Sequence, residues 1–453
     1  MSKDTNIKIP EEYKQIRGTF LKNLKQKKLQ DAYSNIREIL DYPGYFYLEA
    51  VWDDVIELFE KITRELIGDD WGDLVKNIRE NPNDVDALYD LAYYLYEESA
   101  HSIAATFLSR ANKIKPQDEK ILSELVVNLE FMMMNQEACN LLTEAKEVLE
   151  TSEFCRYLLG FNRIMTGNID ETKKLLLTIQ DSQDKDIQFM ANSLKGMIAR
   201  ASFLRSSSSL DNTDLRGWHM VLNGSILLHL SPFGIDDGMN GRYAYISDSY
   251  SLCRQGIDRL KSVIDTAKIK IPCILSLPDR SSRILAMATS KIFKKPFKVW
   301  DEVDIHAEGL IVAYDLNEIF SDEIIHDIAD HRIGQILWVH ASCWTYPFPF
   351  APDITTYLYQ QNNSPWGGGQ MGYNINSKKI EILETNASED EDLSQQIIRA
   401  ERDPEYIDDL DDLLNMVESL NLLNDENKPG IFRTTGRRMH QRVGSPVLSN
   451  RFM

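Results

Sequence analysis

The chain lacks the patterns that mark membrane, zinc-binding and disulfide-rich proteins. No run of about eighteen apolar residues occurs, so no membrane-spanning helix is expected. The five cysteines lie far apart without a C-x-x-C pair, which argues against a zinc site or a redox dithiol. Residues 1–13 lack the apolar core of a secretory signal. We therefore expect a soluble, cytoplasmic protein with reduced thiols and no bound metal.

Positive charge is also in short supply. Fifty Lys and Arg stand against seventy Asp and Glu, a formal charge of −20. This excess repels nucleic acid and anionic lipid unless basic residues are locally concentrated. Only residues 429–453 meet that condition, with five arginines and no acid. Nucleic acid is therefore not an expected partner except through this basic C-terminal tail, which can alternatively dock on the chain's own acidic surface.

A length of 453 residues predicts two or three domains. We expect an α + α/β multidomain protein. Its segments are a helical repeat domain (1–205), a serine-rich linker (206–215), an α/β domain (216–383), an acidic segment (384–428) and the basic tail (429–453). The acidic segment holds fifteen acids and three basic residues, a local charge of −12. Its apolar spacing from Ile407 to Leu420 predicts an amphipathic helix.

A 34-residue period runs through the first half. Pro82 and Pro116 lie 34 residues apart, and small or apolar residues recur at the same interval. The recurring set is Leu88, Leu91, Ala92, Leu95, Ala104, Leu108 and Ala111, then Leu122, Leu125, Val126, Leu129, Ala138, Leu142 and Ala145. Small residues let antiparallel helices approach closely, and proline ends the second helix.

This pattern resembles the tetratricopeptide repeat family. The usual large aromatic of the first helix is replaced by Leu88, and a turn glycine appears only as Gly167. The resemblance implies a curved α-solenoid whose concave face takes a protein or peptide partner. The alternative is that the helices only brace the second half of the chain.

Short apolar runs alternate with helical spacing after residue 215. We expect a helix over 248–266, a strand over 272–277, a helix over 283–293, a strand over 309–316, a helix over 322–329 and a strand over 335–342. Continuous apolar strands separated by helices predict a mainly parallel sheet covered on both faces. Ligands of such sheets bind beyond the carboxyl ends of the strands.

The strand end before Arg283 is a candidate anion site. Arg280, Ser281, Ser282 and Arg283 open a helix, so backbone donors and two guanidinium groups can converge on a phosphate or carboxylate. The alternative is that a serine caps the helix while the arginines pair with nearby acids such as Asp279.

Residues 272–343 also resemble phosphoribosyltransferase-type α/β domains in their order of elements. The resemblance implies that Asp315 positions a ribose or a metal. The family's paired acids and Thr-Thr-Gly are replaced here by Asp315-Leu-Asn-Glu.

Two further candidate sites complete the set. His340 and Cys343 could act as base and thiol nucleophile, although residues three apart on a strand point to opposite faces. Asp236 and Asp237 lie in a glycine-containing loop that can fold over a ligand or serve as a connector.

We therefore expect a repeat-containing adaptor whose α/β domain binds a small phosphate-bearing anion. The alternative is an enzyme acting on a nucleotide or sugar phosphate, with the solenoid selecting the target and no cofactor assigned.

Overall fold

The computed structural model describes residues 11–44, 48–232, 239–368, 371–374, 379–382, 384–401, 409–423, 428–442 and 444–449. The chain divides into two compact units, residues 1–191 and 192–453. Helix α12 (Lys185–Leu204) crosses this division, and the expected linker at 206–215 falls inside the second unit. Among the described residues, no helix combines the length and apolar character needed to cross a membrane.

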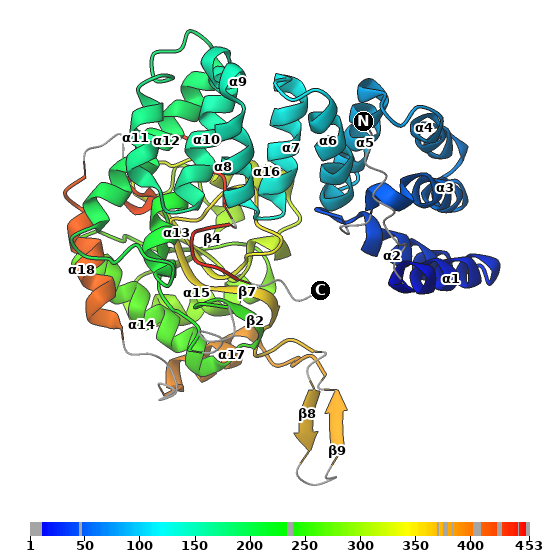
Figure 1. Ribbon diagram of the computed structural model, residues 1–453. Coiled ribbons are helices and arrows are strands. Elements are labelled where there is room, and N and C mark those ends of the chain that lie inside the picture. Colours follow the sequence, from blue (N-terminus) through cyan, green and yellow to red (C-terminus); the bar gives the residue numbers. More distant parts are fainter. Residues whose placement is uncertain are drawn as a thin grey trace. The chain divides into compact units, whose positions relative to one another are not determined.

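All regular secondary structure in the described residues of the first unit is helical, and its successive helices can be followed in Figure 1. They are α1 (Glu11–Lys25), α2 (Leu29–Leu40), α3 (Leu48–Leu66), α4 (Asp69–Glu80), α5 (Val85–Glu97), α6 (His101–Ile114), α7 (Glu119–Phe131), α8 (Asn135–Glu144), α9 (Lys146–Thr151), α10 (Glu153–Met165) and α11 (Ile169–Leu176).

The 34-residue period is a structural repeat. Helices α5, α7 and α10 begin at residues 85, 119 and 153, and helices α6, α8 and α11 begin at 101, 135 and 169. The small residues predicted to allow close packing are buried, Ala92 and Ala104 among them. The first unit therefore has the helical-repeat architecture that the sequence period predicts.

Caps and turns repeat with the helices. Asp84, Asp118 and Ser152 lie 34 residues apart, and each side chain accepts a hydrogen bond from a backbone N–H of the helix that follows it. The turns place Ser99, Met133 and Gly167 in the left-handed region, with φ of 59°, 59° and 82°. Two of these three positions thus hold a side chain where glycine is the favoured residue.

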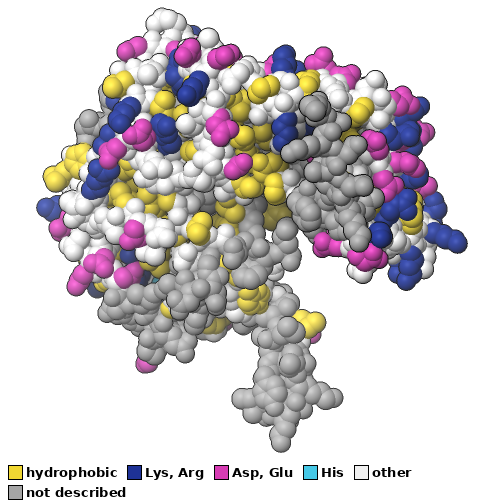
Figure 2. Space-filling view, viewed as in Figure 1, with side chains coloured by type: hydrophobic (Ala, Val, Ile, Leu, Met, Phe, Trp, Pro, Cys, Tyr) yellow, Lys and Arg dark blue, Asp and Glu magenta, His cyan; other side chains and the backbone are white. Residues whose placement is uncertain are grey.

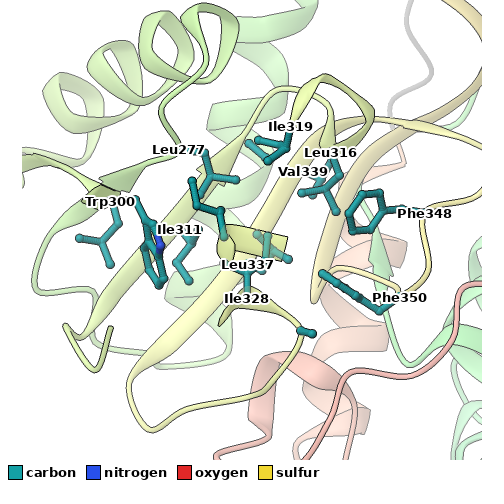
Figure 3. Packing of buried hydrophobic residues seen from close by; sticks show 14 of the residues in the cluster. Leu277, Trp300, Ile311, Leu316, Ile319, Ile328, Leu337, Val339, Phe348 and Phe350 are labelled. Carbon is teal, nitrogen blue, oxygen red and sulfur yellow. The ribbon is translucent and has the colours of Figure 1, made fainter. Parts of the chain in front are cut away.

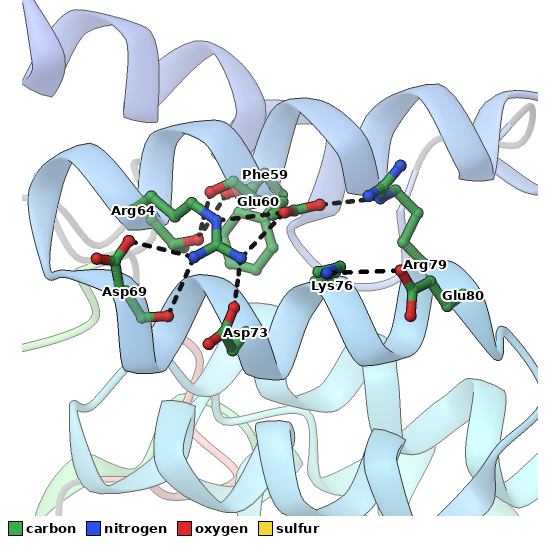
Figure 4. A network of polar contacts seen from close by, with 9 residues as sticks. Phe59, Glu60, Arg64, Asp69, Asp73, Lys76, Arg79 and Glu80 are labelled. Carbon is green, nitrogen blue, oxygen red and sulfur yellow. Dashed lines mark hydrogen bonds and ion pairs between the residues drawn. The ribbon is translucent and has the colours of Figure 1, made fainter.

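Ion pairs join α3 to α4 (Figure 4). Arg64 lies 2.6 Å from the carboxylate of Asp73 and 3.2 Å from that of Glu60. Glu60 also forms an ion pair with Arg79 of α4, whose Nε lies 2.9 Å from Glu60 Oε2. Lys, Arg, Asp and Glu side chains are interspersed over the N-terminal helices in Figure 2, as such pairing requires. These partly exposed pairs add little stability individually, so apolar burial holds the helices together.

The second unit combines a parallel sheet with helices. It contains α13 (Leu215–Asn223), β1 (Ile226–Leu227), β2 (Tyr243–Ser247), α14 (Tyr250–Thr266), β3 (Ile274–Ser276), α15 (Arg280–Phe293), β4 (Phe297–Val299), η1 (Trp300–Glu302), β5 (Gly309–Ala313), η2 (Leu316–Glu318), α16 (Asp322–Ile328), β6 (Gln335–Cys343), β7 (Ile354–Asn363), β8 (Met371–Asn374), β9 (Lys379–Ile382), α17 (Asp390–Arg399), α18 (Leu410–Leu420) and η4 (Gly430–Phe432).

The sheet order is β1-β7-β6-β5-β3-β4, with β2 also paired to β7. All these pairings are parallel. The connection from β3 leads through α15 to β4 on one side, whereas the connection from β5 leads through α16 to β6 on the other. The chain direction across the sheet therefore reverses between β3 and β5, and this is the topological switch point.

Alternate residues of the strands build a core on the α16 face (Figure 3). Leu277, Ile311, Leu337 and Val339 pack there with Ile328 of α16. Aromatic side chains close this cluster, namely Trp300, Phe348 and Phe350. Strands buried on both faces explain the continuous apolar runs of the sequence.

Most elements expected in this unit are confirmed with shifted ends. The helix expected from Arg283 begins at Arg280, because Asp279 caps it through the backbone N–H of Ser282 at 2.7 Å. Strand β7 was not expected, although it is the longest strand and lies inside the sheet. Strands β8 and β9 pair antiparallel with each other in a separate two-stranded sheet.

The acidic segment and the tail both belong to the second unit. Helix α18 buries Leu413, Met416, Val417 and Leu420, which confirms the expected amphipathic helix, whereas Ile407 lies outside the described residues. The tail docks on its own unit. Arg438 donates to Asp353, and the backbone N–H of Arg442 donates to Asn223 Oδ1 at 2.6 Å.

Candidate functional site

The switch point between β3 and β5 is where a parallel sheet of this kind offers a ligand crevice. Asp279 follows β3, and Asp315 and Glu318 follow β5. Asp279 uses Oδ1 to cap α15, while its buried Oδ2 has no hydrogen-bond partner among the described residues. The strand ends thus collect acidic side chains, which the expectation of an anion site did not include.

Asp315 and Glu318, at the switch point, both have raised pKa values. Burial, together with the neighbouring Asp279, raises the pKa of Asp315 to about 6. Asp315 accepts hydrogen bonds from the hydroxyl of Tyr359 and the backbone N–H of Asn317. Glu318 keeps part of its side chain exposed, yet desolvation of its carboxyl raises its pKa to about 7. Two carboxyl groups there can therefore exchange protons near neutral pH.

Both predicted anion-binding arginines have partners in the chain. Nε of Arg280 and Nε of Arg283 lie 2.9 Å from the two carboxylate oxygens of Asp390, the first residue of α17. Arg280 also donates to the backbone oxygens of Asn386 and Ser388. The arginines therefore pair with an acid of the chain, which was the alternative to anion binding. The acid is Asp390, distant in sequence, and not the neighbouring Asp279.

The two predicted serines are also engaged. Ser281 Oγ accepts from the indole N–H of Trp366 at 3.1 Å, and Ser282 Oγ accepts from the backbone N–H of Tyr314 at 2.8 Å. The segment around Trp366 therefore covers the start of α15. The structure brings Ser281 and Glu318 to the same place as Asp315, whereas Asp236 and Asp237 lie outside the described residues.

His340 belongs to a buried polar cluster centred on Asp248. Oδ2 of Asp248 accepts hydrogen bonds from Cys253 Sγ at 3.3 Å, Tyr314 Oη at 2.8 Å and His340 Nε2 at 3.1 Å. Gly256 of α14 makes room for the imidazole, since a Cβ there would lie 3.1 Å from the His340 ring. The cluster ties β2, α14, β5 and β6 together.

The Asp248 cluster also contains residue types that bind metals. The ligand atoms of Asp248, Cys253 and His340 lie within 4.8 Å of one another, and zinc accepts all three types. Burial and Asp248, however, raise the pKa of Cys253 well above its ordinary value, so the group is a thiol that donates to the carboxylate. Hydrogen bonding accounts for this arrangement without an ion.

The second member of the predicted catalytic pair points elsewhere. Cys343 Sγ accepts from the backbone N–H of Tyr346 at 3.4 Å and contacts Thr345 Oγ1 at 3.5 Å. His340 is used by the Asp248 cluster. No hydrogen bond joins His340 and Cys343 in the described part of the chain, and a base–nucleophile pair stays a prediction.

The first unit carries an aromatic surface that was not predicted. We define the aromatic face as Tyr89, Tyr93 and Tyr96 of α5 with Phe131 of α7. Tyr93 is 45% exposed and Phe131 is 50% exposed. Tyr96 meets Phe131 edge to face, with ring centroids 5.8 Å apart. The i, i+4, i+7 spacing of the three tyrosines was the sequence signal for a shared helix face.

Comparisons with known proteins add little. No family model matches the chain, and no curated protein matches it. A solved structure described as MamA AMB-1 matches with a TM-score of 0.24 and 14% identity, over 38% of this chain and 94% of that chain. A TM-score this low does not establish a shared fold, so the helical-repeat description rests on the chain's own 34-residue spacing. The comparisons lend no support to the phosphoribosyltransferase resemblance.

Proposed function

We propose that the protein is an adaptor whose helical-repeat unit binds a protein partner. The observation that carries this proposal is the aromatic face, where Tyr93 and Phe131 leave about half of their surface in water. Contiguous exposed aromatic side chains are typical of protein-binding surfaces, because their burial contributes much of the affinity of an interface. Two consecutive repeats build this face, as expected for a solenoid surface.

Site-specific photo-crosslinking in cells tests the proposal. A benzophenone amino acid replaces Tyr93 or Phe131 in the full chain, and Leu177 of the same unit, which is 69% exposed, serves as the control position. We expect discrete protein adducts at positions 93 and 131 and none at 177. Adduct patterns that are the same at all three positions would exclude the aromatic face as the binding surface.

A second candidate function is binding of a small ligand by the α/β unit. The topological switch point favours it, because Asp279, Asp315 and Glu318 collect where parallel sheets bind ligands. The phosphate-bearing ligand expected from the sequence has less support, since Arg280 and Arg283 are paired with Asp390. An enzyme acting on such a ligand remains the alternative proposal.

Thermal unfolding of the full chain with nucleotides and sugar phosphates tests the second candidate. A ligand that binds only the folded state raises the melting temperature in proportion to its occupancy. A shift that disappears in Asp315→Asn but persists in Glu150→Gln, on α9, would support the switch point as the site. The phosphate proposal fails if no compound shifts the melting temperature at millimolar concentration.

A further inference from the structure

The aromatic face is surrounded by carboxylates. Asp86, Asp90 and Glu97 of α5 recur at the i, i+4 and i+11 positions beside Tyr93, so they lie on one side of the helix. All three side chains are exposed. Within the described part of the chain, none of them forms an ion pair.

Glu124 of α7 places a fourth carboxylate inside the face. Burial and the nearby Glu97 raise its pKa, and its Oε1 is buried without a hydrogen-bond partner in the described structure. The same carboxylate contributes to the raised pKa values of Tyr89 and Tyr96, after the larger effect of burial. The carboxylates of Glu97 and Glu124 and the two phenol rings therefore lie close enough together to affect one another's charge.

One cation of the chain already lies over a ring of the aromatic face. Nζ of Lys120 lies 3.8 Å from the ring centroid of Tyr89, a cation–π contact, and its charge partly offsets that of Glu124. Tyr93 and Tyr96 present further rings with no lysine or arginine over them in the described structure, whereas one side of the Phe131 ring is stacked on the His101 imidazole, with centroids 4.2 Å apart. One internal lysine thus leaves most of the face available.

We propose that the aromatic face binds a lysine- or arginine-rich segment of a partner protein. This inference rests on the proposed adaptor function and names the chemistry of its partner. Basic side chains lie over the tyrosine and phenylalanine rings, while their charges pair with Glu97, Glu124, Asp86 and Asp90. An acidic or purely apolar segment lacks this complementarity and is excluded from the face.

Fluorescence anisotropy with the full chain tests the inference. The probe is a fluorescein-labelled fifteen-residue peptide with lysine at every third position and alanine or leucine elsewhere. The matched probe carries glutamate in place of every lysine. We expect the full chain to bind the lysine peptide and not the glutamate peptide, with affinity that falls as salt is raised, because salt screens the exposed charges.

Variants then locate the binding. Tyr93→Ala combined with Phe131→Ala is expected to weaken binding of the lysine peptide about tenfold or more, corresponding to loss of one or two cation–π contacts. Glu124→Gln is expected to weaken it roughly threefold to tenfold, because it removes a half-buried charge but keeps the shape. The controls are Leu177→Ala and Glu150→Gln, which change an apolar and an acidic residue elsewhere in the first unit and should leave binding unchanged.

The outcomes are distinguishable. Equal binding of both peptides, or loss of binding in the controls, overturns the basic-segment inference. Adducts at positions 93 and 131 without binding of the lysine peptide refute the inference but preserve the adaptor function. Absence of both refutes the two together. Thermal unfolding of each variant shows that it is folded, and Glu124→Gln provides a second test that does not remove an aromatic ring.

Discussion

The guanidinium of Arg438, in the C-terminal tail, donates to the carboxylate of Asp353 at 2.7 Å, and both side chains are only 1% exposed. Asp353 also accepts a hydrogen bond from the backbone N–H of Leu337 in β6. Burial by itself would raise the pKa of Asp353, but Arg438, His331 and the backbone N–H of Leu337 together outweigh burial and hold this pKa below its usual range. The tail is therefore part of the core of the second unit.

Removal of the Arg438 charge should be strongly destabilising. Arg438→Met removes the guanidinium that pairs with the buried Asp353, and we expect a loss of about 3–5 kcal/mol in the free energy of unfolding. Urea denaturation of the full chain measures this. The control is Arg437→Met, because Arg437 is more exposed and no salt bridge is formed by it in the described structure. Equal effects of the two substitutions would contradict a structural role for the Arg438 pair.

A second charged contact should hold α18 to the α/β unit. Asp409, next to the start of α18, lies 2.6 Å from Arg216 and 2.6 Å from Arg259, both of which are buried. Asp409→Asn is expected to lower the free energy of unfolding by about 3 kcal/mol, because it removes the carboxylate that pairs with two buried guanidinium groups. Asp411→Asn, on the exposed side of α18, should change it by less than about 0.5 kcal/mol. Urea denaturation of both variants compares them.

A glycine substitution in a turn of the helical repeat should stabilise the protein. Ser99 has a φ of 59° and an exposed side chain, so Ser99→Gly should raise the free energy of unfolding by about 0.5–1 kcal/mol by relieving the left-handed conformation. The same replacement inside a helix, Ser123→Gly in α7, should lower it by a similar amount. Thermal unfolding distinguishes the two signs, and destabilisation by both would contradict the turn assignment.

The acids of the switch point predict a pH dependence. Folded-state pKa values of about 6 for Asp315 and about 7 for Glu318 lie above their ordinary values of 3.8 and 4.5. The folded state therefore binds more protons than the unfolded state between about pH 4 and pH 7, and these groups contribute a stability that is lost as pH rises through that range. Glu318→Gln should flatten this decline. Urea denaturation at pH 5, 6, 7 and 8 measures it, and an unchanged slope would show that Glu318 titrates normally.

The helical repeat could be read from the sequence because its information is local. Small or apolar residues at positions such as Ala92 and Ala104 recur at an interval of 34 residues, and each repeat contacts mainly its neighbours. The turns were less predictable, since Ser99 and Met133 adopt the conformation for which glycine is the usual signal.

Strand β7 illustrates what sequence reasoning missed. It contains Thr355 and Thr356, both fully buried, so its pattern is not that of a continuous apolar strand. Thr356 Oγ1 accepts a hydrogen bond from the indole N–H of Trp338 in the neighbouring strand. A polar side chain satisfied inside the core has no local sequence signal, because its partner is far away in the chain.

The sequence by itself determined the helical period, the parallel character of the sheet and the strand ends at which Arg280, Ser281 and Asp315 stand. Tertiary structure alone decided what those side chains face. Asp390, 107 residues beyond Arg283, pairs with both arginines, and Asp248 gathers His340, Cys253 and Tyr314. The physical reason is range: helix and strand periodicity arises from neighbours along the chain, whereas the partner of a buried charge or hydrogen-bonding group is fixed only when distant segments pack together.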